Sequence, residues 1–150
     1  MITFLPLQYS NIDIVVQMMN DFYAIDNYCI NIATSKDLFK EFVENENLGK
    51  CWLVHDNNEI VGYVILTFIF SFEYKGKLAF LDELYFKETS RGKGIGSKTI
   101  AFIKAQASYL NVKMMYLEVE NHNQNAQKLY IANDFVFHNR KIMKYTFQNN

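Results

Sequence analysis

The sequence predicts an α/β fold with a mixed, mostly antiparallel sheet of about seven strands and about four flanking helices, in a single domain of residues 1–150. Two observations predict this class. Segments with apolar residues at helical spacing alternate with segments rich in strand-forming residues, and a three-strand meander precedes a glycine-rich loop and a helix. The expected order is strand–helix–helix–strand–strand–strand–helix–strand–helix–strand–strand. No repeat or linker interrupts the chain, whose length is usual for one domain.

The first third is expected to hold one strand and two helices. Residues 2–7 form the strand, and Ser10 caps a helix that starts near Asn11. A second helix runs from Ser35 or Lys36 to about Asn47. The polar and aromatic stretch from Tyr23 to Tyr28 is expected to be a loop between them. The apolar positions that predict the helices are Ile12, Val15, Val16, Met19 and Phe22 in the first and Leu38, Phe39 and Phe42 in the second.

The middle of the chain predicts an antiparallel meander. Its strands are expected at residues 51–55, 60–72 and 77–86. The connecting segments contain Asn, Asp and Gly, which tolerate turn geometry. Beyond the glycine-rich loop, a helix is expected from about Ile95 to Leu110 and a strand at 112–119. A short helix over 126–132 follows, and a closing hairpin of residues 134–138 and 142–147 turns at Asn139 and Arg140.

Composition excludes several classes of protein. Half of the residues are hydrophobic and the formal net charge is −1, so the chain is neither a disordered segment nor a basic nucleic-acid binder. Two cysteines cannot build a disulfide framework or a cysteine-type zinc site, and we expect no metal. The apolar run of residues 60–72 is too short to span a bilayer as a helix. These features predict a cytoplasmic protein without a membrane partner.

The glycine-rich loop carries the strongest chemical signal. It reads Arg91-Gly92-Lys93-Gly94-Ile95-Gly96-Ser97 and lies between a strand and a helix. Its glycines allow close approach of a ligand to the backbone, and the helix N-terminus favours phosphate or pyrophosphate. Ser97 breaks both the Walker pattern and the dinucleotide fingerprint. A third pattern, Arg-x-x-Gly-x-Gly after a meander, is satisfied by Arg91, Gly94 and Gly96.

The loop and its flanking segments resemble the GNAT N-acetyltransferase superfamily. Residues 81–86 resemble the family's fourth strand, and Asn123-x-x-Ala126-x-x-Leu129-Tyr130 resembles the stretch after its fifth strand. The resemblance covers roughly residues 50 to 147. Asp134-Phe135 stands where the family usually has Gly-Phe. Within the family, Gly76-Lys77 followed by Asp82-Glu83 is most similar to diamine acetyltransferases of the spermidine/spermine type.

The resemblance implies acetyl-CoA as the acetyl donor. Backbone amides of Gly92, Lys93, Gly94, Ile95, Gly96 and Ser97 would then hold the pyrophosphate, with Arg91 and Lys93 adding positive charge. The backbone of Leu84, Tyr85 and Phe86 would pair with the pantetheine arm as an added strand, and one amide there would face the thioester oxygen. Asn123 and Ala126 would line the other side of the coenzyme.

The resemblance also implies three catalytic candidates. A carboxylate must take a proton from the alkylammonium acceptor, and Asp82 and Glu83 are the candidates. Neighbouring strand residues point to opposite faces, so only one of them faces the acceptor directly. Position favours Asp82 and side-chain reach favours Glu83; Asp82 is the preferred base. Tyr130 matches the family tyrosine that protonates or hydrogen-bonds the leaving thiolate.

The acceptor is expected to be a small primary amine, such as a polyamine or an aminoglycoside, that attacks directly in a ternary complex. Tyr23, Asp26, Tyr28 and Glu118 are candidates for contacting it. A protein N-terminus or lysine is the alternative acceptor. A non-catalytic CoA-binding sensor and a nucleotide-phosphate binder are alternatives of other classes, and a homodimer is compatible with the family.

Overall fold

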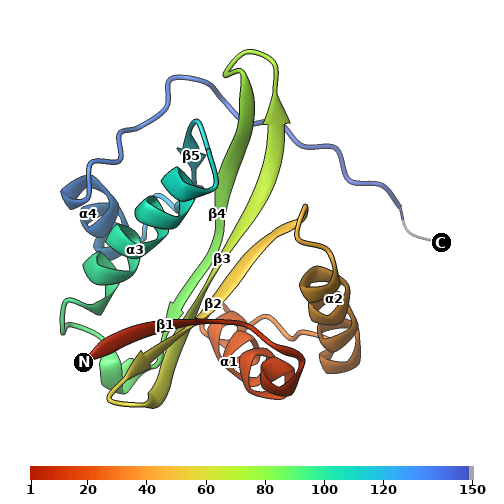
Figure 1. Cartoon of the computed structure of the whole chain (residues 1–150), viewed down its shortest axis with the longest axis vertical. Helices are drawn as coiled ribbons and strands as arrows, with labels where there is room; N and C mark the ends of the chain where they lie inside the picture. Colours follow the sequence, from red (N-terminus) through yellow and green to blue (C-terminus); the bar gives the residue numbers. More distant parts are fainter. Residues whose placement is uncertain (149–150) are drawn as a thin grey trace. The chain divides into compact units, whose positions relative to one another are not determined.

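The structure of the chain, a computed structural model, describes residues 1–148 (Figure 1). It divides into two compact units. The first unit is Met1–Glu118, and the second begins at Val119. The single domain expected from the sequence therefore stays a prediction. The first unit contains β1 (Ile2–Pro6), α1 (Ile12–Ala24), α2 (Ile32–Glu44), β2 (Gly49–Asp56), β3 (Glu59–Ser71), β4 (Gly76–Phe86), α3 (Ile95–Tyr109) and β5 (Met115–Tyr116), and the second contains α4 (Gln124–Ala132).

The sheet has the strand order β1-β2-β3-β4-β5, so every strand lies beside its neighbour in sequence. The first four strands pair antiparallel, and β5 pairs parallel to β4. Helices α1 and α2 cover one face of the sheet, and α3 covers the other (Figure 1). These features confirm the predicted class, a mixed and mostly antiparallel sheet with helices on both faces.

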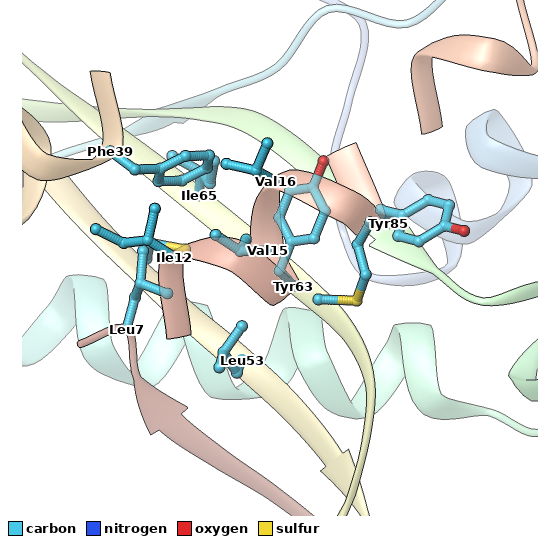
Figure 2. Close-up of a cluster of buried hydrophobic side chains, with 11 residues drawn as sticks. Leu7, Ile12, Val15, Val16, Phe39, Leu53, Tyr63, Ile65 and Tyr85 are labelled. Carbon is cyan, nitrogen blue, oxygen red and sulfur yellow. The ribbon is translucent and has the colours of Figure 1, made fainter. Parts of the chain in front are cut away.

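Two apolar layers hold the helices on the sheet. On the face of α1 and α2, the buried cluster joins Val15 and Val16 of α1 to Leu53, Tyr63 and Tyr85 of the sheet (Figure 2). On the opposite face, the ring of Phe102 from α3 stacks on Phe4 at 4.1 Å and meets Trp52 edge-on at 5.4 Å between centroids. Burial of these aromatic and aliphatic side chains is the main stabilising contribution. The sheet is therefore a rigid support for the residues that project from β4.

The expected strand count of about seven is wrong, because the described residues form five strands. The strand expected at 112–119 is confined to Met115–Tyr116, and the closing hairpin of 134–138 and 142–147 has no strand in residues 134–148. Val136, Phe137, Met143 and Tyr145 are all at least 72% exposed. Alternating apolar residues favour a strand only where a neighbouring strand completes the hydrogen bonds, and this segment has no such partner within residues 1–148.

Helices α1 and α2 begin at other residues than their sequence signals suggest, whereas α3 begins at Ile95 as predicted. A short 3₁₀ turn over Tyr9–Asn11 precedes α1, so Asn11, rather than the predicted Ser10, is its N-cap. Helix α2 begins before Ser35, because the side chain of Asn31 accepts a hydrogen bond of 2.9 Å from the amide of Thr34. The longest helix, α3, has 15 residues. No helix in residues 1–148 is long and apolar enough to cross a membrane.

Candidate active site

A β-bulge in β4 decides which of the two neighbouring carboxylates faces the α1 side of the sheet. Leu81 pairs with Leu66 and Glu83 pairs with Ile65, so Asp82 is the unmatched residue of the bulge. Cross-strand partners project to the same face. Ile65 belongs to the core cluster beneath α1 and α2, and Glu83 therefore projects to that face. Asp82 is exposed, whereas Glu83 is half-buried.

Glu83 lies among aromatic side chains. The Tyr63 hydroxyl donates a hydrogen bond of 3.1 Å to Glu83 Oε1, and Tyr23 also hydrogen-bonds this carboxylate. Burial raises the pKa of Glu83 to about 7. The bonds from Tyr63 and Tyr23 lower this pKa, whereas the neighbouring charge of Asp82 raises it. The result is a carboxylate that gains and loses its proton close to neutral pH.

Asp82 has a different electrostatic setting. Although the residue is exposed as a whole, neighbouring groups remove part of the hydration of its carboxyl, which raises its pKa, and the nearby carboxylate of Glu118 raises it further. Glu118 itself is exposed at the end of the first unit. Asp82 is thus close enough to repel the charge of Glu83, and Glu118 is close enough to repel the charge of Asp82. Such a group of carboxylates favours the approach of a cation.

The structure brings one of the three candidate residues in the stretch 23–28 to Glu83. That residue, Tyr23, lies in the last turn of α1 rather than in the expected loop. Tyr23 reaches the carboxylate, and burial followed by the charges of Glu83 and Asp82 raises the Tyr23 pKa to about 12. The ring of Tyr28 lies 5.7 Å from that of Tyr23 and is 62% exposed, so it continues the aromatic surface outward. Asp26 is exposed, and no ion pair involves it in the described part of the chain.

The glycine-rich loop has the backbone conformation that its sequence predicts. Gly92 and Gly94 both have φ of 75°, in the left-handed region, and an added Cβ at either would meet no atom within 4 Å. Gly94 is the N-cap of α3 and contributes no side-chain cap. The backbone N–H groups of the first turn, which have no partner within the helix, carry its partial positive charge beside this exposed loop. Gly92, Lys93 and Gly94 are exposed, and Ile95 begins the helix as a buried anchor.

Arg91 ties this loop to the end of β4. Its Nε donates a hydrogen bond of 3.0 Å to the carbonyl of Phe86, and its guanidinium carbon lies 5.8 Å from the centre of the Tyr85 ring. The loop is thus held beside residues 84–86. Lys93, Gly96 and Ser97 follow on the loop and the first turn of α3.

The edge of β4 that faces β5 is paired over two residues. Ala79 pairs with Met115 and Phe80 with Tyr116, and no further β4–β5 pair occurs within residues 1–148. Leu84, Tyr85 and Phe86 keep their pairs with β3 on the other side. Alternate backbone groups of this segment point to an edge that has no strand on it, which is the arrangement that strand addition requires. The segment suits an extended ligand of alternating amide donors and acceptors.

The second unit holds the remaining candidates. Asn123 caps α4 by accepting a hydrogen bond of 3.1 Å from the amide of Ala126. Tyr130, one helix turn further on, is half-buried, and burial raises its pKa. Its ring packs edge-on against Phe135 at 5.7 Å. The hydroxyl of Tyr130 is therefore protonated at neutral pH, as a proton donor must be.

The sequence did not single out Tyr63. It lies within the apolar stretch of residues 60–72, where a tyrosine is indistinguishable from the other core residues. The available signal is that a fully buried tyrosine hydroxyl requires a polar partner. The meander offers one in the acidic pair on the next strand, Asp82 and Glu83.

Comparison with known proteins adds a family assignment to this geometry. The sequence model of the "Acetyltransferase (GNAT) family" matches residues 15–135. An uncharacterized N-acetyltransferase of Bacillus subtilis is 22% identical over 121 residues, which cover 81% of this chain and 80% of that protein. A thialysine N-epsilon-acetyltransferase of Bos taurus is 36% identical over 73 residues, or 49% of this chain and 42% of that protein.

The fold recurs in solved structures. A predicted acetyltransferase of Clostridium acetobutylicum, solved with acetyl-CoA, superposes with a TM-score of 0.81 at 18% identity, covering 97% of this chain and 96% of that one. At this identity the likeness concerns the fold. It confirms the arrangement of helices and sheet that supports the β4 bulge and the glycine-rich loop.

Proposed function

Since the chain belongs to the GNAT acetyltransferase family and is an N-acetyltransferase, we propose that it transfers the acetyl group of acetyl-CoA to the primary amine of a small cation, with Glu83 as the general base. One observation carries this proposal. Glu83 is a half-buried carboxylate whose pKa burial raises to about 7. A base with this pKa is far better matched to proton transfer at neutral pH than an ordinary glutamate.

The amine must lose a proton before it attacks. An alkylammonium group has a pKa of about 10, so the acceptor arrives charged at pH 7. The ionised Glu83 accepts one N–H proton, directly or through a water molecule, and leaves a neutral amine with a free electron pair. That electron pair forms the new C–N bond at the thioester carbonyl, whose oxygen takes up the negative charge. The C–S bond then breaks as the carbonyl re-forms. The glutamic acid later returns its proton to solvent.

Acetyl-CoA, when bound, supplies an activated carbonyl and a thiolate leaving group. Three features of this chain fit it. The loop of Gly92 and Gly94 presents backbone amides at the N-terminus of α3 to the pyrophosphate. The edge of residues 84–86, which carries no neighbouring strand within residues 1–148, suits the amide-containing pantetheine arm. We propose that Arg91 and Lys93 add electrostatic attraction for the phosphates, and that an amide of this β4 segment stabilises the oxyanion.

We propose that Tyr130 donates the proton that the leaving thiolate takes up. Its pKa is raised by burial, so its hydroxyl carries a proton at neutral pH. The proton lost by the attacking nitrogen on forming the amide restores the tyrosine. The products are then the acetylated amine and CoA with a free thiol. Asn123 and Ala126, which set the start of α4, are proposed to line the coenzyme on the same helix as Tyr130.

The surroundings of Glu83 support a small cationic acceptor, such as a polyamine or an aminoglycoside. Asp82 and Glu118 extend the negative charge beyond the base. Tyr23 and Tyr28 provide aromatic faces, which attract ammonium groups. The bovine relative is named for acetylating thialysine at its ε-nitrogen, which is also an amine of a small molecule.

A thiol-release assay with acetyl-CoA over a panel of amines tests the proposal. The panel comprises polyamines, aminoglycosides, lysine analogues and a peptide with a free N-terminus. We expect release with small polyvalent amines, and loss of that release in Glu83→Gln. Release with the peptide alone would overturn the acceptor class, and undiminished release by Glu83→Gln would overturn the base.

A further inference from the structure

We propose that Tyr63 is a positioning residue of this acetyltransferase: its buried hydroxyl orients the Glu83 carboxylate and stabilises its ionised form. This inference rests on the proposed function, in which Glu83 is the base. Tyr63 lies on β3 and has no exposed surface. Its hydroxyl donates to Glu83 Oε1 over 3.1 Å. Because it cannot reach the acceptor from this buried position, Tyr63 acts through Glu83.

The sheet register explains how Tyr63 reaches the carboxylate. Tyr63 pairs with Tyr85, and Glu83 pairs with Ile65, so Tyr63 and Glu83 are diagonal neighbours on one face. Long aromatic side chains span this diagonal separation. The ring of Tyr63 is fixed by contact with that of Tyr85, 5.8 Å between centroids. A fixed ring delivers its hydroxyl to one place, so the hydrogen bond restricts the rotation of the Glu83 carboxylate.

Tyr23 completes a two-sided hold on the same carboxylate. It comes from α1 rather than from the sheet, and its hydroxyl also hydrogen-bonds Glu83. The Tyr23 ring lies 5.8 Å from that of Phe22, which stacks on Tyr85 at 5.4 Å. One donor is thus fixed by the strand and the other by the helix. Tyr23 is partly exposed, so its hold is open to solvent and that of Tyr63 is not.

The groups around Glu83 leave the tyrosines as its stabilising partners. From its own strand Asp82 repels its charge, and from β2 the buried thiol of Cys51 lies close enough to have its own pKa raised, first by burial and then by Glu83. No lysine or arginine forms an ion pair with Glu83 in residues 1–148. Burial and Asp82 favour the protonated carboxyl, whereas the hydroxyls of Tyr63 and Tyr23 favour the carboxylate.

This opposition has a functional consequence. Without the tyrosine bonds, a buried glutamate beside an aspartate would be protonated at neutral pH and could not accept a proton from the amine. The bond from Tyr63 keeps a useful fraction of Glu83 ionised near pH 7 while burial preserves its basicity. Removal of the Tyr63 hydroxyl alone is therefore expected to raise the pKa of Glu83 above about 7.

A titration of the full chain by NMR tests this inference without requiring an acceptor. Glutamate side-chain carboxyl carbons are labelled with ¹³C, and the resonance missing in Glu83→Gln is assigned to Glu83. In the wild type it should titrate at about 7. In Tyr63→Phe, which keeps the ring, its midpoint should rise by about 1 pH unit, or about tenfold in the proton dissociation constant, the lower end of the effect of one hydrogen bond to a charged group.

Phe39→Leu is the matched control for loosened packing. Phe39 belongs to the same buried cluster but carries no hydroxyl, so its variant should unfold at lower temperature with the Glu83 midpoint unchanged. If Tyr63→Phe does not fold, the Cζ resonance of Tyr63 in the wild type provides the second measurement, and it should shift with the Glu83 midpoint of about 7 as the partner of its hydroxyl ionises. An unchanged midpoint in the folded tyrosine variant, or a Tyr63 Cζ resonance without this shift, would overturn the inference.

The readouts separate this inference from the proposed function. If Glu83→Gln abolishes amine-dependent thiol release and the Tyr63→Phe midpoint stays at about 7, Glu83 is the base and Tyr63 does not tune it. If Glu83→Gln keeps full release, the proposed base is wrong whatever Tyr63→Phe does to the titration.

Discussion

Glu83 and the loop of residues 91–97 both belong to the first unit, but one depends on buried side chains and the other on exposed backbone. Around Glu83 the chemistry resides in side chains that are buried and aromatic, and burial sets the proton affinity. In the loop it resides in exposed backbone, held open by two left-handed glycines. Single side-chain replacements should therefore change proton transfer strongly at Glu83, whereas the loop should respond to changes in backbone conformation.

The largest expected effect is that of Glu83→Gln. The amide keeps the size of the side chain but accepts no proton from an amine, so kcat/KM should fall by about 10²- to 10⁴-fold. Acetyl-CoA binding, measured by calorimetry, should be unchanged, because the loop is built from other residues. Asp82→Asn is the matched control and should lose less than about tenfold, since Asp82 is the exposed residue of the bulge. The reverse ranking would contradict the account.

A smaller effect is expected for Gly94→Ala, which tests the backbone character of the loop. Gly94 has φ of 75°, and an L-residue there costs about 1–2 kcal/mol, or roughly 5- to 30-fold in the Kd for acetyl-CoA. The added Cβ meets open space, so the loss arises from conformation rather than from collision. Gly96→Ala, within the first turn of α3, should bind nearly as the wild type does. Equal losses at both glycines would point to steric exclusion of the ligand instead.

The Tyr130→Phe variant tests whether Tyr130, in the second unit, donates a proton to the leaving thiolate, while Glu83 removes one from the amine. A thiolate is a good leaving group, because its conjugate acid has a pKa of about 8.5, so kcat should fall by only about tenfold. The Kd for acetyl-CoA should stay within about twofold, because no backbone contact is altered. If kcat of Tyr130→Phe equals that of the wild type at every pH from 6 to 9, Tyr130 is not the proton donor.

The smallest effect concerns stability, and it should have the opposite sign to the loss of activity. The folded pKa of Glu83 is raised from 4.5 to about 7, so its contribution to stability is fully present below about 4.5 and is lost as pH rises through about 7. Glu83→Gln carries no such charge and should be more stable than the wild type at pH 8, by about 1 kcal/mol or a few degrees in Tm. Thermal unfolding at pH 5 and pH 8 checks this, and a pH-independent difference would contradict it.

The fold class and the glycine-rich loop were predictable because their signals are local. Alternating glycines before a helical pattern are visible in the sequence alone, and Gly92 and Gly94 have the predicted backbone freedom. The prediction of a closing hairpin was wrong for the opposite reason. Its alternating pattern over residues 134–147 is local, whereas strand formation depends on a partner edge that no local pattern encodes.

The orientation of the acidic pair was not predictable for a related reason. At the turn of the β3–β4 hairpin Ser71 pairs with Gly76, and continuing that register unchanged would pair Ile65 with Asp82. The bulge inserts one residue and moves Glu83 into that place. A one-residue shift exchanges the faces of neighbouring side chains. The sequence therefore reduced the proposed base to two candidates, and the register shows that Glu83 is the one on the face of α1 and α2.

The pH dependence of kcat/KM for the best amine of the panel tests the central proposal, that Glu83 is the base, most directly. Activity should rise as pH increases through about 7, because the base must be deprotonated. This rise should persist in Asp82→Asn and be absent from the residual activity of Glu83→Gln. A rise near pH 7 that survives in Glu83→Gln and disappears in Asp82→Asn would contradict this proposal.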